Sequence, residues 1–163
     1  MIKYIFLDVD GVLTDGAIIY GEHCGEIKNF NVRDGLGIKL AIRLGYEIFV
    51  LTGRNSNVTK QRCKELGITN VFQGLDNKVK IYEEIKRKYN FSDNEAAYIG
   101  DDINDISLLK KVGFSATVND APDYVKDVVD FIVPVDGGKG AVRVFIEEII
   151  KRNGQWEKVL SFY

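Results

Sequence analysis

Residues 4–11 read YIFLDVDG, a short apolar run followed by two carboxylates and a glycine. The run Tyr4–Leu7 predicts a buried β-strand. Alternate residues of a strand point to the same side, so we expect Asp8 and Asp10 to converge where this strand ends. Gly11 permits a sharp exit from the strand. Two carboxylates at the start of a loop also occur as ordinary turn residues. Other motifs in the chain are therefore needed to distinguish a functional pair from a turn.

The same order of short apolar strand, turn and amphipathic helix recurs along most of the chain. Strands are expected at Tyr4–Leu7, Glu47–Leu51, Val71–Phe72, Ala96–Ile99, Phe114–Thr117 and Phe131–Ile132. Helices are expected at Gly35–Leu44, Val58–Leu66, Lys78–Tyr89, Ile103–Lys110 and Ala141–Lys151. Strands that alternate with helices form a mostly parallel sheet covered on both faces. The sequence therefore predicts an α/β fold, a three-layer sandwich around a central sheet.

Residues 16–31 depart from this order, because two strand-like runs flank a loop bracketed by Gly21 and Gly25. This pattern predicts a β-hairpin inserted directly after the first strand. A hairpin at that point lies above the carboxyl ends of the strands, where open α/β sheets bind their ligands. We expect one domain over residues 1–152, without a linker or an internal repeat.

Residues 153–163 read NGQWEKVLSFY and form an aromatic-rich tail after the last expected helix. Two arrangements are open for this tail. It either packs as a helix on its own domain or reaches a neighbouring subunit as an arm.

The composition excludes several classes of protein. The 163 residues include 22 Lys and Arg against 24 Asp and Glu, a net charge of −2, and nucleic-acid binding needs a net basic face. No apolar run approaches the roughly 20 residues of a membrane span. Met1 leads directly into the first strand, so no signal peptide is expected, and the two cysteines lack a CxxC spacing. We expect a soluble cytoplasmic protein with no nucleic-acid or membrane partner.

A second cluster of carboxylates follows the strand expected at Ala96–Ile99. Gly100-Asp101-Asp102 closes that strand, and Asn104 and Asp105 follow at a helix start. Helix capping by Asp102 or Asn104 accounts for one of these residues but leaves the others unexplained. Clustered like charges destabilise a fold unless a cation neutralises them, and oxygen ligands on short loops suit Mg²⁺. The sequence therefore predicts a magnesium site.

Two further elements provide positive charge and hydrogen-bond donors. Thr52-Gly53-Arg54 ends the strand Glu47–Leu51, and a hydroxyl, an amide and a guanidinium at a strand end make an anion-binding corner. Lys78 begins an expected helix, where a lysine that serves only the surface is disfavoured. Taken singly, Thr52-Gly53-Arg54 is also compatible with an ordinary strand-to-helix turn, and Lys78 with an ordinary surface lysine.

The ordered set DxDG, TG, Lys and GDDxxD resembles the haloacid dehalogenase-like phosphatase superfamily over essentially the whole chain. The resemblance implies the Rossmann-like sheet of that superfamily. It implies that Asp8 is the nucleophile, forming an aspartyl-phosphate that water hydrolyses, and that Asp10 is the general acid and base. It implies that Thr52, the Gly53 amide and Lys78 hold the phosphoryl oxygens.

The resemblance also implies how the metal is held. Mg²⁺ would be bound by Asp8, by the main-chain carbonyl of Asp10 and by Asp101, with Asp102 or Asp105 supporting these ligands. Larger members carry a cap domain between these motifs, but here the intervals hold only the hairpin, two helices and a short strand. Without a cap, the hairpin or a second subunit has to supply specificity. We therefore expect an oligomer, a homotetramer in which a neighbouring subunit covers the active site.

Four stretches narrow the resemblance to capless members that act on phosphorylated sugar acids: DVDGVLTDG at 8–16, FNVRDG at 30–35, TGR at 52–54 and GGKGAVR at 137–143. The last usually continues with Glu, whereas this chain has Val144. The resemblance implies substrate contacts from Asp10, Asn31, Val32, Arg33, Asp34, Gly35, Thr52, Gly53, Arg54, Arg62 and Lys78. Such a substrate carries a phosphate and a carboxylate, and the arginine fork recognises both. Arg33 and Asp34 could instead simply cap and flank the next helix.

The expected function is Mg²⁺-dependent hydrolysis of a phosphorylated sugar acid, with 3-deoxy-D-manno-octulosonate 8-phosphate as the expected ester and lipopolysaccharide synthesis as the implied pathway. The first alternative is a nine-carbon analogue of the ketodeoxynonulosonate 9-phosphate type. The second is a non-catalytic oligomerisation module, like the domains appended to sugar-acid nucleotidyltransferases. The intact set of charged motifs favours an enzyme over a module.

Overall fold

The protein is described by a computed structural model that covers residues 1–23 and 25–163. Cys24, in the predicted hairpin, lies outside the described residues, and Cys63 is a buried free thiol. Six parallel strands form the central sheet in the order β5-β4-β1-β6-β7-β8. These strands are β1 (Tyr4–Leu7), β4 (Glu47–Leu51), β5 (Asn70–Phe72), β6 (Ala96–Ile99), β7 (Phe114–Thr117) and β8 (Phe131–Ile132). The predicted α/β class and parallel sheet are confirmed.

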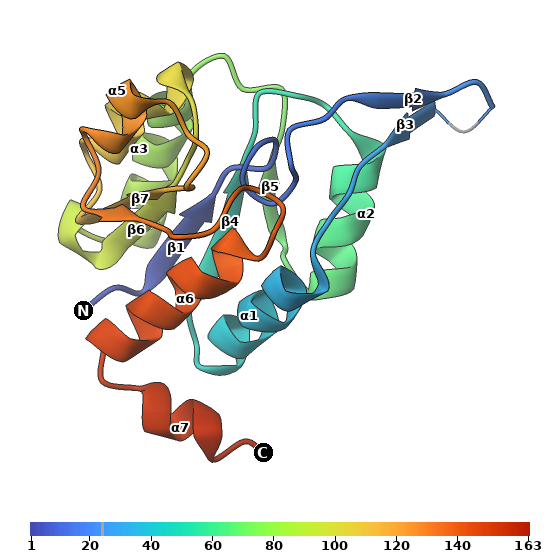
Figure 1. The fold of residues 1–163 in the computed structure, drawn as a ribbon. Coiled ribbons are helices and arrows are strands. Elements are labelled where there is room, and N and C mark those ends of the chain that lie inside the picture. Colours follow the sequence, from blue (N-terminus) through green and yellow to red (C-terminus); the bar gives the residue numbers. More distant parts are fainter. Residues whose placement is uncertain (24) are drawn as a thin grey trace.

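Helices cover both faces of this sheet (Figure 1). They are α1 (Val32–Arg43), α2 (Asn57–Leu66), α3 (Lys78–Tyr89), α4 (Ile106–Leu109), α5 (Asp123–Lys126), α6 (Ala141–Arg152) and α7 (Trp156–Leu160), with 3₁₀ turns η1 (Asp93–Glu95) and η2 (Ile103–Asp105). Helix α1 packs against α6 and α2, whereas α3 packs against α4. Right-handed crossovers explain this division, because connections that run toward opposite edges of a parallel sheet place their helices on opposite faces.

Most predicted boundaries hold within a few residues, and three differences have local causes. Helix α1 starts three residues earlier than predicted, because Asn31 caps it by accepting the Arg33 amide proton at 2.8 Å. The helix predicted over Ile103–Lys110 is instead the turn η2 followed by α4, since the Asp105 side chain folds back onto the Asp102 amide. Helix α5, only four residues long, was not predicted.

The strand order reverses direction at β1, and this reversal places the site. From β1 the chain first builds β4 and β5 toward one edge, and then β6, β7 and β8 toward the other. Ligands of open α/β sheets bind at such a switch point, at the carboxyl ends of the strands. Leu7, the last residue of β1, is in register with Val50 of β4 and with Ile99 of β6. The residues that follow these three strands therefore emerge side by side.

The predicted hairpin forms a separate two-stranded sheet from β2 (Ile19–Gly21) and β3 (Gly25–Ile27). It projects away from the body of the molecule (Figure 1). In the described residues, the hairpin and α1 lie between β1 and β4, and α2 and β5 lie between β4 and α3, so these intervals contain no cap domain. None of the described helices is long and apolar enough to cross a membrane.

Candidate active site

Nine residues from neighbouring strand ends line a cavity of about 220 Å³. They are Asp8, Asp10, Thr52, Gly53, Arg54, Lys78, Asp101, Asp102 and Asn104. Eight of the nine were predicted as site residues from the motifs, and Asn104 was noted as a helix-start residue. The carboxylates, the TGR corner and the lysine therefore meet in one place, at the switch point of the sheet.

In the loop after β1, the backbone of Gly11 lies very close to the Asp101 side chain. Gly11 has a φ of +85°, and a Cβ atom built on it would lie 2.0 Å from Asp101 Oδ2. Any other residue would push Asp101 out of its position, because that contact is far below van der Waals distance. The Thr14 hydroxyl, which is buried, accepts the Gly11 and Gly16 amide protons at 3.4 and 3.2 Å. Glycine and threonine thus hold the loop that brings Asp8 toward Asp101.

Asp8 and Asp101 are both held in an environment that disfavours two negative charges. Burial raises the pKa of Asp8 to about 7, with Lys78 opposing the rise and Asp105 adding to it. Burial, followed by the charges of Asp8 and Asp105, raises the pKa of Asp101 to about 8. A divalent cation between the two carboxylates would relieve both effects.

Three carboxylates are close enough to share an ion: one oxygen each from Asp8, Asp101 and Asp105 lies within 4.8 Å of the others. Asp105, however, is fully buried, does not line the cavity and already accepts two hydrogen bonds on each of its oxygens. Its Oδ2 accepts the amide protons of Asp101 and Asp102 at 2.9 and 3.1 Å, and its Oδ1 accepts from Lys78 and Tyr98. Asp8 and Asp101 are therefore the carboxylates that fit Mg²⁺, with Asp105 supporting the loop.

Lys78 is the first residue of α3, and its side chain is 3% exposed. Its Nζ lies 2.8 Å from Asp8 Oδ2 and 2.6 Å from Asp105 Oδ1. Burial lowers the pKa of Lys78, but these two carboxylates outweigh that effect and the pKa lies above its ordinary value. The lysine therefore stays charged beside Asp8, as an anion-binding group requires.

Asp102 differs from its neighbours in the acidic cluster. It is exposed, its Oδ1 accepts the Ile103 amide proton at 2.7 Å, and the Tyr124 hydroxyl donates to the same oxygen at 3.1 Å. These contacts match the capping alternative considered for this residue. Asp102 therefore shapes the rim of the cavity.

The sequence interpretation missed two charged residues of the hairpin. The Lys28 ammonium, whose side chain is 2% exposed, pairs with Asp10 and lies 3.5 Å from Glu26 Oε1. The Arg54 guanidinium lies 2.9 Å from the same Glu26 oxygen. The alternation of Glu26 and Lys28, two residues apart in a predicted strand above the site, was the available signal. The hairpin therefore contacts the cavity through alternating charges.

The segment after the hairpin, together with Arg62, lies in a different place from the carboxylates. Asn31, Asp34, Gly35 and Arg62 line a separate small space with Leu13, Phe30, Cys63, Leu66 and Ile68. Val32 and Arg33 are exposed, whereas Asp34 is buried and its Oδ1 accepts the Arg143 amide proton of α6 at 2.7 Å. Within one subunit the structure does not bring this segment into the cavity around Asp8.

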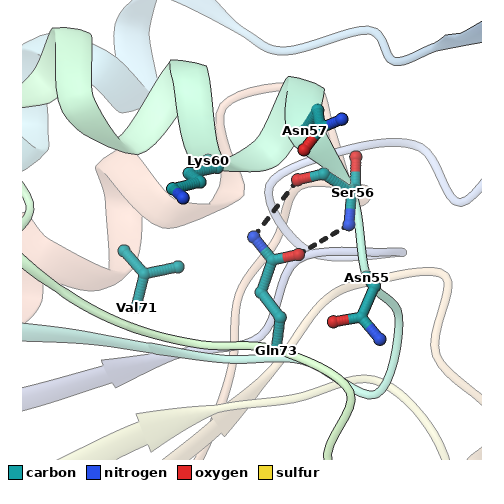
Figure 2. Close-up of a pocket in the computed structure, with 6 residues that line it drawn as sticks. All are labelled: Asn55, Ser56, Asn57, Lys60, Val71 and Gln73. Carbon is teal, nitrogen blue, oxygen red and sulfur yellow. Dashed lines mark hydrogen bonds between the residues drawn. The ribbon is translucent and has the colours of Figure 1, made fainter.

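A second cavity, of about 450 Å³, lies beside the TGR corner (Figure 2). Gln73 spans its floor, accepting the Ser56 amide proton at 2.6 Å and donating to the Ser56 carbonyl at 3.2 Å. These two bonds fix the start of α2 relative to the end of β5. They therefore hold the loop that carries Thr52 and Arg54 in place from its far side.

The fold and the site together are those of a haloacid dehalogenase-like hydrolase, and the model of that family matches residues 70–145. The 3-deoxy-D-manno-octulosonate 8-phosphate phosphatase KdsC of Escherichia coli K12 is 38% identical over 157 residues, covering 96% of this chain and 84% of that protein. The enzyme of the same name from Haemophilus influenzae is 40% identical, covering 94% and 86%. The chain therefore belongs to the 3-deoxy-D-manno-octulosonate 8-phosphate phosphatase family.

A solved structure of this family shows the same fold. The phosphatase from Moraxella catarrhalis, in complex with magnesium, phosphate and KDO, superposes with a TM-score of 0.94 at 37% identity. The match covers 99% of this chain and 94% of that one.

Proposed function

We propose that this protein is a Mg²⁺-dependent phosphomonoesterase that hydrolyses 3-deoxy-D-manno-octulosonate 8-phosphate. The observation that carries the proposal is the convergence of Asp8, Asp101 and Lys78 in one cavity at the carboxyl edge of the sheet. A nucleophilic carboxylate, an ion site and a buried cation are the parts that phosphoryl transfer needs. The family relationship supports the same conclusion.

Asp8 would attack phosphorus and form an aspartyl-phosphate, while Asp10 donates a proton to the leaving alkoxide. Asp10 would then take a proton from the water that hydrolyses the intermediate. Lys78 keeps the Asp8 carboxylate in place from one side, because its Nζ lies 2.8 Å from Oδ2, and the Val9 amide donates to Oδ1 at 2.7 Å from the other.

Thr52, the Gly53 amide and Lys78 would bind the phosphoryl oxygens, all three lining the cavity that Asp8 faces. Asp8, the main-chain carbonyl of Asp10 and Asp101 would hold Mg²⁺, with Asp102 and Asp105 supporting the loop. The ion supplies charge neutralisation for the phosphoryl group when bound. The magnesium in the Moraxella catarrhalis structure supports this assignment.

Recognition of the sugar acid would use arginine. Arg54 lines the cavity and is 38% exposed on its side chain, so it can bind the substrate carboxylate. Of the remaining predicted contacts, Val32 and Arg33 are exposed and could reach a substrate in a neighbouring subunit. Asn31, Asp34, Gly35 and Arg62 would act by fixing that segment.

The active assembly would be a homotetramer in the cytoplasm, with a neighbouring subunit covering each open site. Four large apolar side chains of the hairpin region support a subunit contact there. They are Ile18, Ile19, Tyr20 and Ile27, and each is at least 43% exposed. Exposed apolar side chains gathered on one projecting element are a common feature of protein interfaces.

The test is a panel of phosphorylated sugar acids, assayed for phosphate release with Mg²⁺, with Ca²⁺ and with a chelator. We expect turnover of the eight-carbon ester with Mg²⁺ only, because Ca²⁺ takes more ligands and binds the nucleophile in an unreactive pose. Faster turnover of the nine-carbon ester would replace the substrate assignment. Turnover of neither ester would favour the oligomerisation module, and activity in chelator would contradict the metal assignment.

A further inference from the structure

The ammonium group of Lys78 is surrounded by three oxygen acceptors. Nζ lies 2.8 Å from Asp8 Oδ2, 2.6 Å from Asp105 Oδ1 and 3.1 Å from the Tyr98 hydroxyl oxygen. An ammonium has three N–H donors, so each donor has one of these oxygens as its partner. Because the side chain is 3% exposed, the protein rather than solvent sets the direction of these donors.

Tyr98 is the only uncharged member of this set of three. It lies in β6, is fully buried, and its hydroxyl donates to Asp105 Oδ1 at 2.5 Å. Since the phenol proton is used on Asp105, the phenol oxygen can only accept from Lys78. Tyr98 therefore fixes the direction of one Lys78 N–H bond, and Asp105 fixes the direction of Tyr98.

We infer that Tyr98 is a positioning residue that orients the Lys78 ammonium toward the phosphoryl group. This inference rests on the proposed function, in which Lys78 binds a phosphoryl oxygen beside Asp8. Two N–H bonds of Lys78 are directed at Asp105 and Tyr98, neither of which lines the cavity. The third remains on the side of Asp8 and the cavity, where a phosphoryl oxygen would share it.

Removal of the phenol hydroxyl leaves one N–H of a buried ammonium without its acceptor and allows the group to rotate. The buried, unpaired donor is costly, so the ammonium rotates to pair it, and the N–H on the cavity side loses its fixed direction toward the phosphoryl oxygen. The loop that carries Asp101 is bonded separately from the contact between Lys78 and Tyr98, because the amides of Asp101 and Asp102 donate to Asp105 Oδ2 and not to Oδ1. In this variant, binding of the phosphoryl group should therefore weaken, whereas the Mg²⁺ requirement should stay nearly unchanged.

The chain offers a matched control for this substitution. Tyr82 of α3 is also fully buried, and its hydroxyl donates to the Asp93 carboxylate at 2.7 Å, whereas Lys78 donates to Tyr98 and not to Tyr82. Tyr98→Phe and Tyr82→Phe remove the same atom from the same kind of bond. They differ in whether Lys78 depends on that atom.

The experiment measures tungstate binding by calorimetry in the presence of Mg²⁺, together with kcat, KM and the Mg²⁺ concentration for half-maximal activity. Tungstate serves as a phosphoryl-like oxyanion that needs no turnover. For Tyr98→Phe we expect the tungstate Kd to rise and kcat/KM to fall by at least about tenfold, with the Mg²⁺ requirement within about twofold. For Tyr82→Phe we expect both quantities to stay within about twofold of the wild type, with a comparable loss of thermal stability.

An unchanged tungstate Kd in folded Tyr98→Phe, or an equal loss in Tyr82→Phe, would overturn the inference. If Tyr98→Phe does not fold, 3-fluorotyrosine at position 98 replaces it, since the more acidic phenol keeps its shape but accepts more weakly. An unchanged Kd there would also overturn it. A wild type that binds tungstate but hydrolyses no ester refutes the proposed function alone, and one that binds no tungstate refutes both.

Discussion

Asp8 is bonded on both carboxylate oxygens, to the Val9 amide and to Lys78, while its pKa is raised by burial. These bonds fix the direction of the Asp8 carboxylate, but burial makes its ionised form unfavourable unless positive charges lie nearby. The neighbouring Lys78 and a bound cation together make the ionised form accessible at neutral pH. The charge state of Asp8, at the end of β1, thus depends on Lys78 at the start of α3 and on the cation.

Asp8→Asn is expected to lower phosphate release by at least about a thousandfold, because an amide cannot form the acyl-phosphate. The substitution nearly preserves shape, and the Val9 amide keeps an oxygen acceptor, so circular dichroism should show a folded protein. Phosphate release is measured with the preferred ester and Mg²⁺. Asp15→Asn, at an exposed loop position, is the control and should retain activity. Retained turnover in Asp8→Asn would remove Asp8 from its proposed role.

Asp34 gives a prediction for stability against pH. It is 1% exposed, its Oδ2 has no hydrogen-bond partner among the described residues, and burial raises its pKa to about 6. The folded state therefore retains a proton between about pH 4 and 6 that the unfolded chain has released. Consequently the Asp34 carboxyl lowers the free energy of unfolding as pH rises through that range. The loss of stability persists at higher pH.

Asp34→Asn removes this deficit, so its stability relative to wild type should rise from pH 4 to pH 6 by about 2–3 kcal/mol. The Asn oxygen can still accept the Arg143 amide proton. Urea unfolding at a series of pH values measures the difference. Asp76→Asn, at an exposed position, should show no such trend. A pH-independent difference for Asp34→Asn would show that the carboxyl is not the cause.

Some of these residues could be predicted from the sequence and others could not. Asp8 and Lys78 were predicted because the end of a strand and the start of a helix can each be recognised from the local sequence pattern. Tyr98 was not, since a tyrosine in an apolar strand is ordinarily a core residue, and only the folded sheet brings it to Lys78. Lys28 does alternate with Glu26 in the predicted strand, but its pairing with Asp10, 18 residues away, becomes apparent only in the folded chain.

The hairpin is held to the body of the molecule by charge. Glu26 lies between Lys28 and Arg54, and both cations also approach Asp10, Lys28 as a direct pair and Arg54 at 4.0 Å. An isolated two-stranded hairpin is marginally stable in water. These ion pairs therefore help to hold the base of the hairpin formed by β2 and β3 against the residues of the cavity.

Glu26→Gln is expected to increase proteolytic cleavage or amide exchange in β2 and β3 by about threefold to fivefold. Removal of its charge leaves two neighbouring cations with less compensation, worth about 0.5–1 kcal/mol for partly exposed pairs. The difference should shrink at high salt. Glu22→Gln, at an exposed position in the hairpin turn, is the matched control. Equal exchange rates in Glu26→Gln and wild type would show that the ion pairs do not hold the hairpin.

The tail contacts helix α1 and the turn that follows it in its own chain. The Arg43 guanidinium of α1 lies 3.8 Å from the Phe162 ring centroid, and the Tyr46 hydroxyl donates to Gln155 Oε1 at 2.7 Å. Val159 of α7 is 4% exposed. These are the contacts of the first arrangement that the sequence left open, in which the tail packs on its own domain.

Deletion of residues 155–163 is expected to lower stability by about 2–3 kcal/mol, from the apolar burial lost around Val159 and Trp156. Thermal unfolding measures this loss, and sedimentation should show the same assembly as the full chain. Tyr163→Ala, at an 85% exposed side chain, should change neither quantity. A changed assembly after deletion would instead identify the tail as an arm that reaches a neighbour.

At the scale of the whole molecule, the open cavity and the apolar hairpin surface point to assembly as a condition for specificity. Within one subunit the cavity is bordered by the hairpin on one side, and the described residues provide no cap. The segment 31–35 lies outside the cavity of its own subunit, so its proposed role in substrate contact depends on a neighbouring copy. The missing cap favours an oligomer, which stays a prediction, and the sequence alone does not specify which surfaces would form its contacts.

A double substitution, Ile18→Ser with Tyr20→Ser, tests this assembly. These side chains are 54% and 72% exposed, and their replacement should lower the mass measured by sedimentation equilibrium from that of the proposed tetramer to that of a smaller species. Ile132→Ser, at a 45% exposed position of β8, is the control and should leave the mass unchanged. An unaltered tetramer in the double variant would place the subunit contact elsewhere.

Asn153 joins the two ends of the fold, accepting the Ile2 amide proton at 3.2 Å and donating to the Ile2 carbonyl at 2.8 Å. β1 also lies in the middle of the sheet, between β4 and β6, so its second edge stays unpaired until residues 96–99 have been made. During synthesis on the ribosome, β1 therefore emerges well before β6, the partner of its second edge, has been made. The nascent chain must keep this apolar strand from aggregating throughout that interval.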